Sequence, residues 1–298
     1  MAAVPMCPGC RALLAPEEAA CPYCGWNVRQ TEVRREGGVV ERALRPVGGV
    51  IPVLIGANVL LFLGTIVAQM ALTRAKGVDG FVDSVMNPGG RTLALLGANV
   101  PEHVLKGQWW RLLCPVFLHG GILHIAMNMM ALRNIGGAVV DAFGAGKALA
   151  LYLVAGIAGN LASVAWFHWM GGNGMVPRIG ASGAIFGIVG LIAALGFRIG
   201  GEQGKSLWKP MVQSIVLMLV LGFILSKSGG PILLDNTGHV GGFLCGLGTG
   251  FVCTFGVRAR GDLAAVRAWD TAAIVLSALT VASFVPPALM LAEALRRV

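Results

Sequence analysis

The sequence predicts an all-α polytopic membrane protein, because of its composition, its long apolar stretches and its glycine content. Of the 298 residues, 56% are hydrophobic and only 12% are charged, and the mean hydropathy is +0.75. A water-soluble domain is far less apolar than this. Several stretches reach the roughly 20 residues that a helix needs to cross a bilayer. The 44 glycines suit a bundle in which small residues let such helices pack closely.

Seven stretches are the candidate membrane-spanning helices. The fifth is short, and the fourth and sixth contain several glycines, which weaken a helix. We expect no cleavable signal peptide before the first, because the chain begins with a polar, cysteine-rich segment. The expected spans are residues 49–72, 117–140, 147–169, 180–199, 211–226, 234–256 and 270–292.

Basic residues orient the bundle. Six arginines precede the first span and place the N-terminus in the cytoplasm, because segments rich in Lys and Arg stay inside. Arg296 and Arg297, after the last span, count against this orientation. We expect an integral multi-pass protein of a bacterial inner (plasma) membrane, and the net charge of +9 requires no nucleic acid partner. The six arginines are Arg11, Arg29, Arg34, Arg35, Arg42 and Arg45.

The N-terminal segment carries two C-x-x-C pairs, Cys7 with Cys10 and Cys21 with Cys24. Four thiolates in this arrangement can close a tetrahedral zinc site, and a cytoplasmic location keeps them reduced. A disulfide pair and a redox C-x-x-C are the alternatives. We expect a zinc-ribbon-like module over residues 1–26 with a structural zinc, a candidate docking site for a cytoplasmic partner, followed by a linker over 27–46.

A few polar residues stand inside the predicted spans, where burial in lipid is costly. Ser182 lies in the stretch GASGAIFG, His124 and Asn128 lie four apart on one helical face, and His239 begins the sixth span. Each has a structural reading, because serine is a common packing residue and a lone histidine often only hydrogen-bonds. The other reading is chemical, because glycine opens space for a substrate to reach a nucleophilic serine.

The predicted topology favours the chemical reading. Spans two, four and six all run from the outside to the inside, and the four polar residues fall within the first turns of these spans. They therefore lie at a similar depth, about 5 to 15 Å below the outer surface at about 1.5 Å per residue. A hydroxyl, an imidazole base and two hydrogen-bond donors at one level form the constellation of a hydrolase.

Over residues 46–295 the sequence resembles the rhomboid intramembrane serine proteases. The resemblance implies a six-helix catalytic core, here residues 47–257, and an additional transmembrane helix within 258–298. It also implies that the substrates are transmembrane segments of other membrane proteins, cleaved near the outer face. The matching residues, in order, are Trp110, Arg111, His119, His124, Asn128, Gly180, Ser182, Gly183, His239, Gly242 and Gly246.

The resemblance also implies roles for these residues. Ser182 would be the nucleophile and His239 the general base, with no cofactor for catalysis. His124, Asn128 and the Ser182 backbone N–H would stabilise the oxyanion. Supporting roles in packing, in bracing the first loop and beside the imidazole fall to His119, Trp110, Arg111, Gly180, Gly183, Phe186, Gly242 and Gly246.

Two other classes of protein compete with a protease. A catalytically silent rhomboid-like scaffold would bind transmembrane clients without cutting them, and the presence of both Ser182 and His239 argues against it. A channel or transporter predicts charged or broken helices in repeat-related positions, and the sequence has no such repeat. Asp235, four residues before His239, could complete a triad, but we expect it in a loop where water screens it.

Overall fold

The chain is an all-α bundle in the computed structural model, as the sequence predicts. The structure describes residue 20 and residues 38–171, 174–227, 235–253 and 263–297. Within these residues every regular element is a helix. An isolated β-bridge pairs Asn99 with Arg178. The four cysteines of the predicted zinc module, Cys7, Cys10, Cys21 and Cys24, lie outside the described residues.

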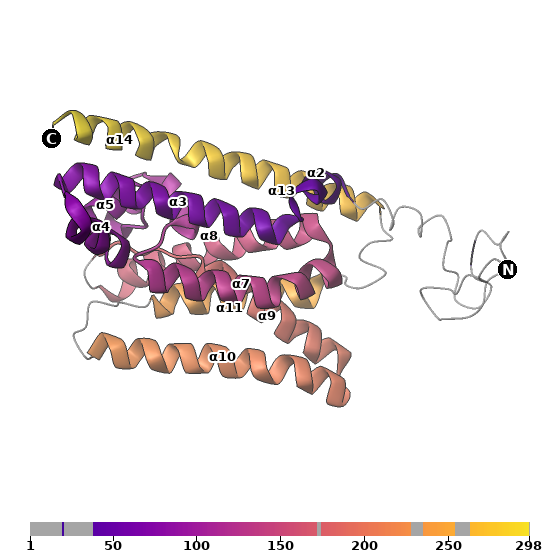
Figure 1. Ribbon diagram of the computed structural model, residues 1–298. Helices are drawn as coiled ribbons and strands as arrows, with labels where there is room; N and C mark the ends of the chain where they lie inside the picture. The colour runs from indigo at the N-terminus through magenta and orange to yellow at the C-terminus, as the bar shows by residue number, and fades with distance from the viewer. Residues whose placement is uncertain (1–19, 21–37, 172–173, 228–234, 254–262, 298) are drawn as a thin grey trace.

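Figure 1 shows how the described helices are arranged. Those with more than ten residues are α3 (Val50–Thr73), α7 (Ile122–Phe143), α8 (Ala145–Met170), α9 (Ser182–Ile199), α10 (Gly201–Lys227), α11 (Asn236–Val252), α13 (Leu263–Ser283) and α14 (Val285–Arg296).

Five of the described helical units are long and apolar enough to cross a membrane. These are α3, α8, α9, most of α10, and α13 continued by α14. The predicted second and sixth spans are the helices α7 and α11, which fall short by this measure. Helix α7 carries polar side chains in its first half, and α11 has 17 residues, many of them glycine. These two helices hold His124, Asn128 and His239.

Three predicted spans differ from the helices observed. The second begins at Ile122 and not at 117, because Gly120 and Gly121 interrupt the chain and Gly121 has φ +143°. Helix α10 begins ten residues before the predicted fifth span and carries Pro210 inside it. The last span is interrupted at Phe284, because two prolines open α14.

The long first loop is a compact set of short helices. We expected only a loop between spans one and two, whereas the chain there folds into five short helical segments. They pack on α3, α8 and α14. They are α4 (Gly77–Met86), α5 (Gly90–Leu95), α6 (Pro101–Leu105), η2 (Trp109–Leu112) and η3 (Cys114–Phe117).

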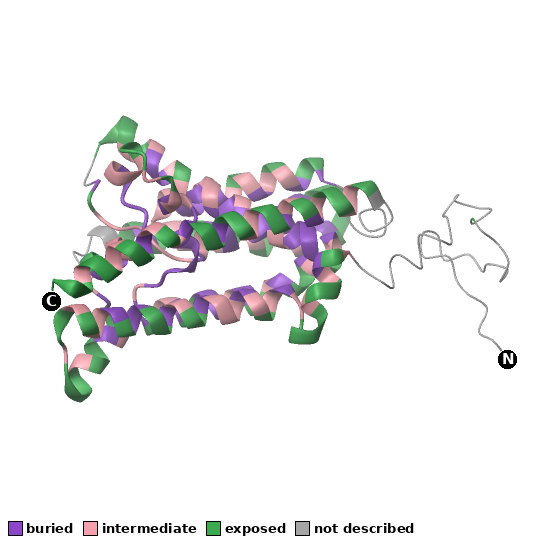
Figure 2. Cartoon of the chain, turned by 90° about the horizontal axis from the view of Figure 1, so that it is seen from above, coloured by how far each residue is buried: buried purple, intermediate pink, exposed green. Residues whose placement is uncertain are grey.

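Helix α9 is the centre of the bundle, and α10 lies at its edge. Two thirds of the α9 span (67%) is buried inside the protein, against 11% of the α10 span. Figure 1 shows α10 along one side and α13 with α14 along the opposite side. Figure 2 shows buried residues where the helices meet and exposed residues along their outward faces. These outward faces are apolar, as a lipid environment requires.

The end of the predicted linker is helical and is held by the additional C-terminal helix. Residues 38–46 include α2 (Val39–Leu44) and the start of η1 (Arg45–Val47). The buried carboxylate of Asp270 in α13 accepts a hydrogen bond of 2.5 Å from the backbone N–H of Val39. Gly38 and Gly146 leave room for this carboxylate, because a Cβ on either would overlap it.

Candidate active site

Ser182 is the first residue of α9, at the end of the loop that enters the bundle. Gly180, two residues earlier, has φ +120°, a conformation that side-chain-bearing residues rarely adopt. This turn directs the chain into α9 with Ser182 in its first turn. The N–H groups of a first helical turn have no intrahelical acceptor, so the Ser182 N–H remains available, and the helix dipole favours negative charge there.

His239 lies in the first turn of α11, directly opposite Ser182. Its Nε2 and the Ser182 Oγ are 2.8 Å apart, a hydrogen-bonding distance. The histidine is 3% exposed, and the Phe186 ring packs against it with ring centroids 4.9 Å apart. Among the described residues its Nδ1 has no hydrogen-bond partner. The ring is therefore positioned by packing on one side and by the serine on the other.

Glycines let α8, α9 and α11 approach closely enough for this contact. A Cβ on Gly242 would overlap the Gly183 carbonyl oxygen, and one on Gly246 would overlap that of Gly187. A Cβ on Gly159 of α8 would lie 2.7 Å from the Gly238 carbonyl oxygen. Bulkier residues at these positions would separate the helices. The short distance between His239 and Ser182 thus depends on these glycines, because they have no side chains to keep the helices apart.

His124 and Asn128 of α7 face the loop that leads to Ser182. A Cβ built on Gly180 would lie 2.7 Å from His124 Nε2 and 3.6 Å from Asn128 Nδ2. The Gly120 N–H donates to His124 Nδ1 at 3.4 Å, so in a neutral ring the proton resides on Nε2. Asn128 is buried, and its Nδ2 has no acceptor among the described residues. The unpaired Asn128 amide and the His124 Nε2 therefore border the chain just before Ser182.

The remaining motif residues of the first loop are buried or half-buried in the protein. His119 is fully buried, and its ring stands edge-on to that of His124 at 5.1 Å between centroids. Arg111 is 2% exposed and donates to the carbonyl oxygens of Ala94 and Ala98 at 2.7 and 2.8 Å. It braces the loop from inside. The exposed ring of the pair Trp109 and Trp110 is Trp109, which the motif did not single out.

Cys114 is a cysteine of the first loop. It is fully buried and lies 3.2 Å from both the hydroxyl and the carbonyl oxygen of Ser283. Burial raises the pKa of the Cys114 thiol to about 11. The thiolate is the reactive form of cysteine, so this residue is inert at neutral pH and serves to pack α13 on the loop.

The family model that matches this chain is the rhomboid domain, over residues 106–255. This range is half of the chain and runs from the end of the first loop through α11. The chain belongs to the rhomboid family. The match includes the loop motif, Ser182, His239 and the glycines between them.

Among curated proteins, three relatives illustrate the similarity of this rhomboid. Rhomboid protease GluP of Bacillus subtilis (strain 168) is 36% identical over 155 residues, covering 52% of this chain and 28% of GluP. Rhomboid-like protease 1 of Toxoplasma gondii is 35% identical over 169 residues, 55% of this chain and 54% of the relative. RHOMBOID-like protein 5 of Arabidopsis thaliana is 34% identical over 171 residues, which cover 56% of this chain and 52% of the relative. The rhomboid thus spans about half the length of two of them and less of GluP.

Asp235 occupies a different place from the one that the sequence predicted for it. We expected a loop position where water surrounds the carboxylate. In this rhomboid Asp235 is the N-cap of α11, and its side chain accepts from the Gly238 N–H at 3.1 Å. Ser163 of α8 also donates to it, and Arg178 lies 3.8 Å away. The expectation of a loosely held side chain is wrong, because the carboxylate accepts a hydrogen bond from a free N–H group of the helix end. Ser163 and Arg178 carried no motif that could have identified them.

Proposed function

We propose that this rhomboid is an intramembrane serine protease that hydrolyses peptide bonds in or near transmembrane segments of membrane proteins. The observation that carries the proposal is the 2.8 Å contact between His239 Nε2 and Ser182 Oγ. Serine is a weak nucleophile until an adjacent base removes its proton, and this is the geometry that such activation needs. Support also comes from relatives that are named proteases, GluP and Rhomboid-like protease 1.

The proposed reaction uses the two residues in turn. Ser182 Oγ attacks the substrate carbonyl carbon while His239 Nε2 takes the hydroxyl proton. The tetrahedral intermediate collapses to an acyl-serine, and the imidazolium gives its proton to the leaving amine. A water molecule then attacks the ester, with His239 again accepting a proton, and Ser182 is released with its proton restored.

The negative oxygen of the tetrahedral intermediate needs donors. His124 Nε2, Asn128 Nδ2 and the Ser182 N–H border one region ahead of α9, where the Asn128 side chain is buried and that of His124 is half-buried. Donors that are fixed before the reaction lower its barrier more than donors that must reorganise. We assign the oxyanion to this group.

The mechanism is a dyad. A triad acid would accept a hydrogen bond from the other imidazole nitrogen, and no described carboxylate contacts His239 Nδ1. The oxygens of Asp235, the nearest acid in the sequence, bind other groups. His239 therefore acts as the base without a carboxylate hydrogen-bonded to its second ring nitrogen.

Substrate entry is proposed to be lateral, past α10. This helix contacts α9 and α11 but leaves most of its surface uncovered, with 11% of its span buried. Its separation from the remaining bundle would open the region of Ser182 to a transmembrane segment from the bilayer. Our further proposals are a location in a bacterial inner membrane, a cytoplasmic N-terminus, and a structural zinc on Cys7, Cys10, Cys21 and Cys24 that serves a cytoplasmic partner.

The decisive experiment combines a fluorophosphonate probe with cleavage of a model transmembrane substrate. The purified full-length protein should be labelled on Ser182, and Ser182→Ala and His239→Ala should each abolish cleavage while the protein remains folded. Ser206→Ala, an exposed serine on α10, is the matched control and should retain both activities. Wild-type protein that binds transmembrane clients but is neither labelled nor able to cleave them would establish the silent scaffold instead.

A further inference from the structure

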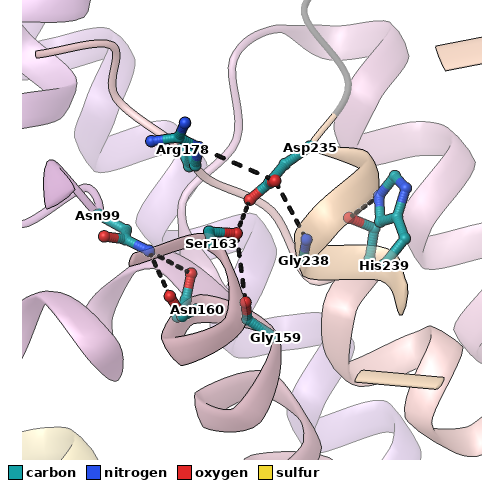
Figure 3. A network of polar contacts seen from close by, with 9 residues as sticks. Asn99, Gly159, Asn160, Ser163, Arg178, Asp235, Gly238 and His239 are labelled. Atoms are coloured by element: carbon teal, nitrogen blue, oxygen red, sulfur yellow. Dashed lines mark hydrogen bonds and ion pairs between the residues drawn. The ribbon is translucent and has the colours of Figure 1, made fainter. Parts of the chain in front are cut away.

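Asp235 connects three segments of the bundle (Figure 3). One carboxylate oxygen accepts the Gly238 N–H at 3.1 Å, within the first turn of α11. The other accepts from the Ser163 hydroxyl of α8, and the Arg178 Nε lies 3.8 Å from the carboxylate. Figure 3 shows the carboxylate turned toward these groups and away from the His239 ring.

The groups that hold Asp235 are themselves fixed. Arg178 and Asn99 exchange two backbone hydrogen bonds of 3.0 and 2.8 Å, which attach the loop before α9 to the first loop. Asn99 Nδ2 donates to the carbonyl and side-chain oxygens of Asn160 at 3.1 and 3.2 Å. Asn160 in turn donates to Leu112 O at 3.0 Å. One continuous polar network therefore joins the first loop, α8, the loop before α9, and α11.

The position of this network in the chain matters for the reacting pair. Arg178 precedes Ser182 by four residues, and Asp235 precedes His239 by four residues. The backbone N–H of His239 donates to the Asp235 carbonyl oxygen at 3.0 Å, so the cap and the histidine share one helical turn. Glycine contacts limit how closely α11 can approach α8 and α9. The Asp235 carboxylate supplies attractive contacts that keep the start of α11 close to α8 and to the loop before α9.

We propose that Asp235 is a positioning residue, which keeps His239 at hydrogen-bonding distance from Ser182 by fixing the start of α11 to α8 and to the loop before Ser182. It acts without touching the imidazole. The proposal rests on the function proposed above, because it assigns a reason for the geometry of that site.

The chemistry of the network predicts different results for two substitutions. Asparagine keeps one acceptor oxygen for the Gly238 N–H. Its NH₂ can donate to Ser163, whose hydroxyl then turns to the Gly159 carbonyl oxygen 3.2 Å away. Only the charge pairing with Arg178 is lost, and both partners are 21% exposed, so solvent weakens that pairing already. Alanine loses all three contacts.

The test measures the rate constant for fluorophosphonate labelling of Ser182 in full-length protein, separately from the fraction of protein that becomes labelled. Asp235→Ala should lower the rate constant by about ten- to a hundredfold, because displacement of a catalytic group by about 1 Å costs that much. Asp235→Asn should stay within about tenfold of wild type. Ser163→Ala, which removes one contact, should fall between them, and the exposed Glu202→Ala on α10 should leave the rate constant unchanged.

Each outcome has a defined meaning. A lower labelled fraction with an unchanged rate constant in both Asp235→Ala and Ser163→Ala would show that the network only supports folding, and would overturn the proposal. Asp235→Asn as damaging as His239→Ala would make Asp235 a triad acid and would overturn it as well. Failure of wild-type protein to label at all is a separate result, because it removes the proposed function itself and the positioning role with it.

Discussion

At the residue scale, the candidate site consists of a few polar side chains that lie close together inside the helix bundle. His239 and Ser182 face each other, the donors of Asn128 and His124 border the same region, and the Asn128 amide has no acceptor among the described residues. A buried amide donor without a partner is costly in any protein. Its presence here is explained if the missing acceptor is the oxyanion of a bound substrate.

This explanation predicts the effect of removing each donor. Asn128→Ala and His124→Ala should each lower kcat by about 10²- to 10³-fold, about 2.7 to 4 kcal/mol of transition-state stabilisation, with a small change in KM. The measurement is steady-state cleavage of one model substrate in one detergent, with folding verified for each variant. Asn134→Ala is the matched control, because Asn134 is an exposed residue of the same helix. Equal kcat values for Asn128→Ala and Asn134→Ala would exclude Asn128 from the oxyanion site.

At the element scale, the distance between α9 and α11 is set by glycine. The sequence predicted close approach at Gly242 and Gly246 from their spacing, and the structure places them against the Gly183 and Gly187 carbonyls. The break in the last span at Phe284 could have been read from the two prolines that follow. The contacts of Asp235 could not, because Ser163, Arg178 and Asp235 are distant in sequence and meet only through the packing of α8 and α11.

A pair of substitutions on α11 tests the role of glycine. Gly246→Ala should destabilise the protein by about 1 to 3 kcal/mol through overpacking and slow the labelling of Ser182, because the added methyl group overlaps the Gly187 carbonyl. Gly248 faces open space on the same helix, so Gly248→Ala should be neutral or stabilising, by up to about 1 kcal/mol. Thermal unfolding in detergent and the labelling rate are the readouts. Equal effects of the two variants would show that the helix contact is not limiting.

At the scale of the whole molecule, the rhomboid bundle carries additions at both ends. The predicted zinc module precedes residue 38, and α13 with α14 follows the six-helix core. The carboxylate of Asp270 in α13 accepts a hydrogen bond from the start of α2. The C-terminal addition therefore contacts the segment that follows the predicted zinc module. The two C-x-x-C pairs predict the zinc module and the last apolar stretch predicts the C-terminal helix, whereas the contact between α13 and α2 depends on a side chain that no motif marks.

The zinc prediction belongs to this scale. Purified protein should contain about one zinc per chain, bound by Cys7, Cys10, Cys21 and Cys24, and replacing these cysteines by serine should remove it. Deleting residues 1–30 should leave cleavage in detergent largely intact, because the predicted topology places the module across the membrane from Ser182. Metal analysis and cleavage assays measure the two effects. Loss of catalysis on deletion would show that the N-terminal segment is part of the catalytic fold.

The contact between Cys114 and Ser283 sets an order of events during synthesis. These residues are 169 positions apart, so the first loop cannot dock on the end of α13 until the chain has been synthesised as far as Ser283. Ser182 and His239 are only 57 positions apart, and both precede α13. The reacting pair can therefore meet in a nascent chain whose first loop still lacks its contact with α13, and the later insertion of α13 adds that contact.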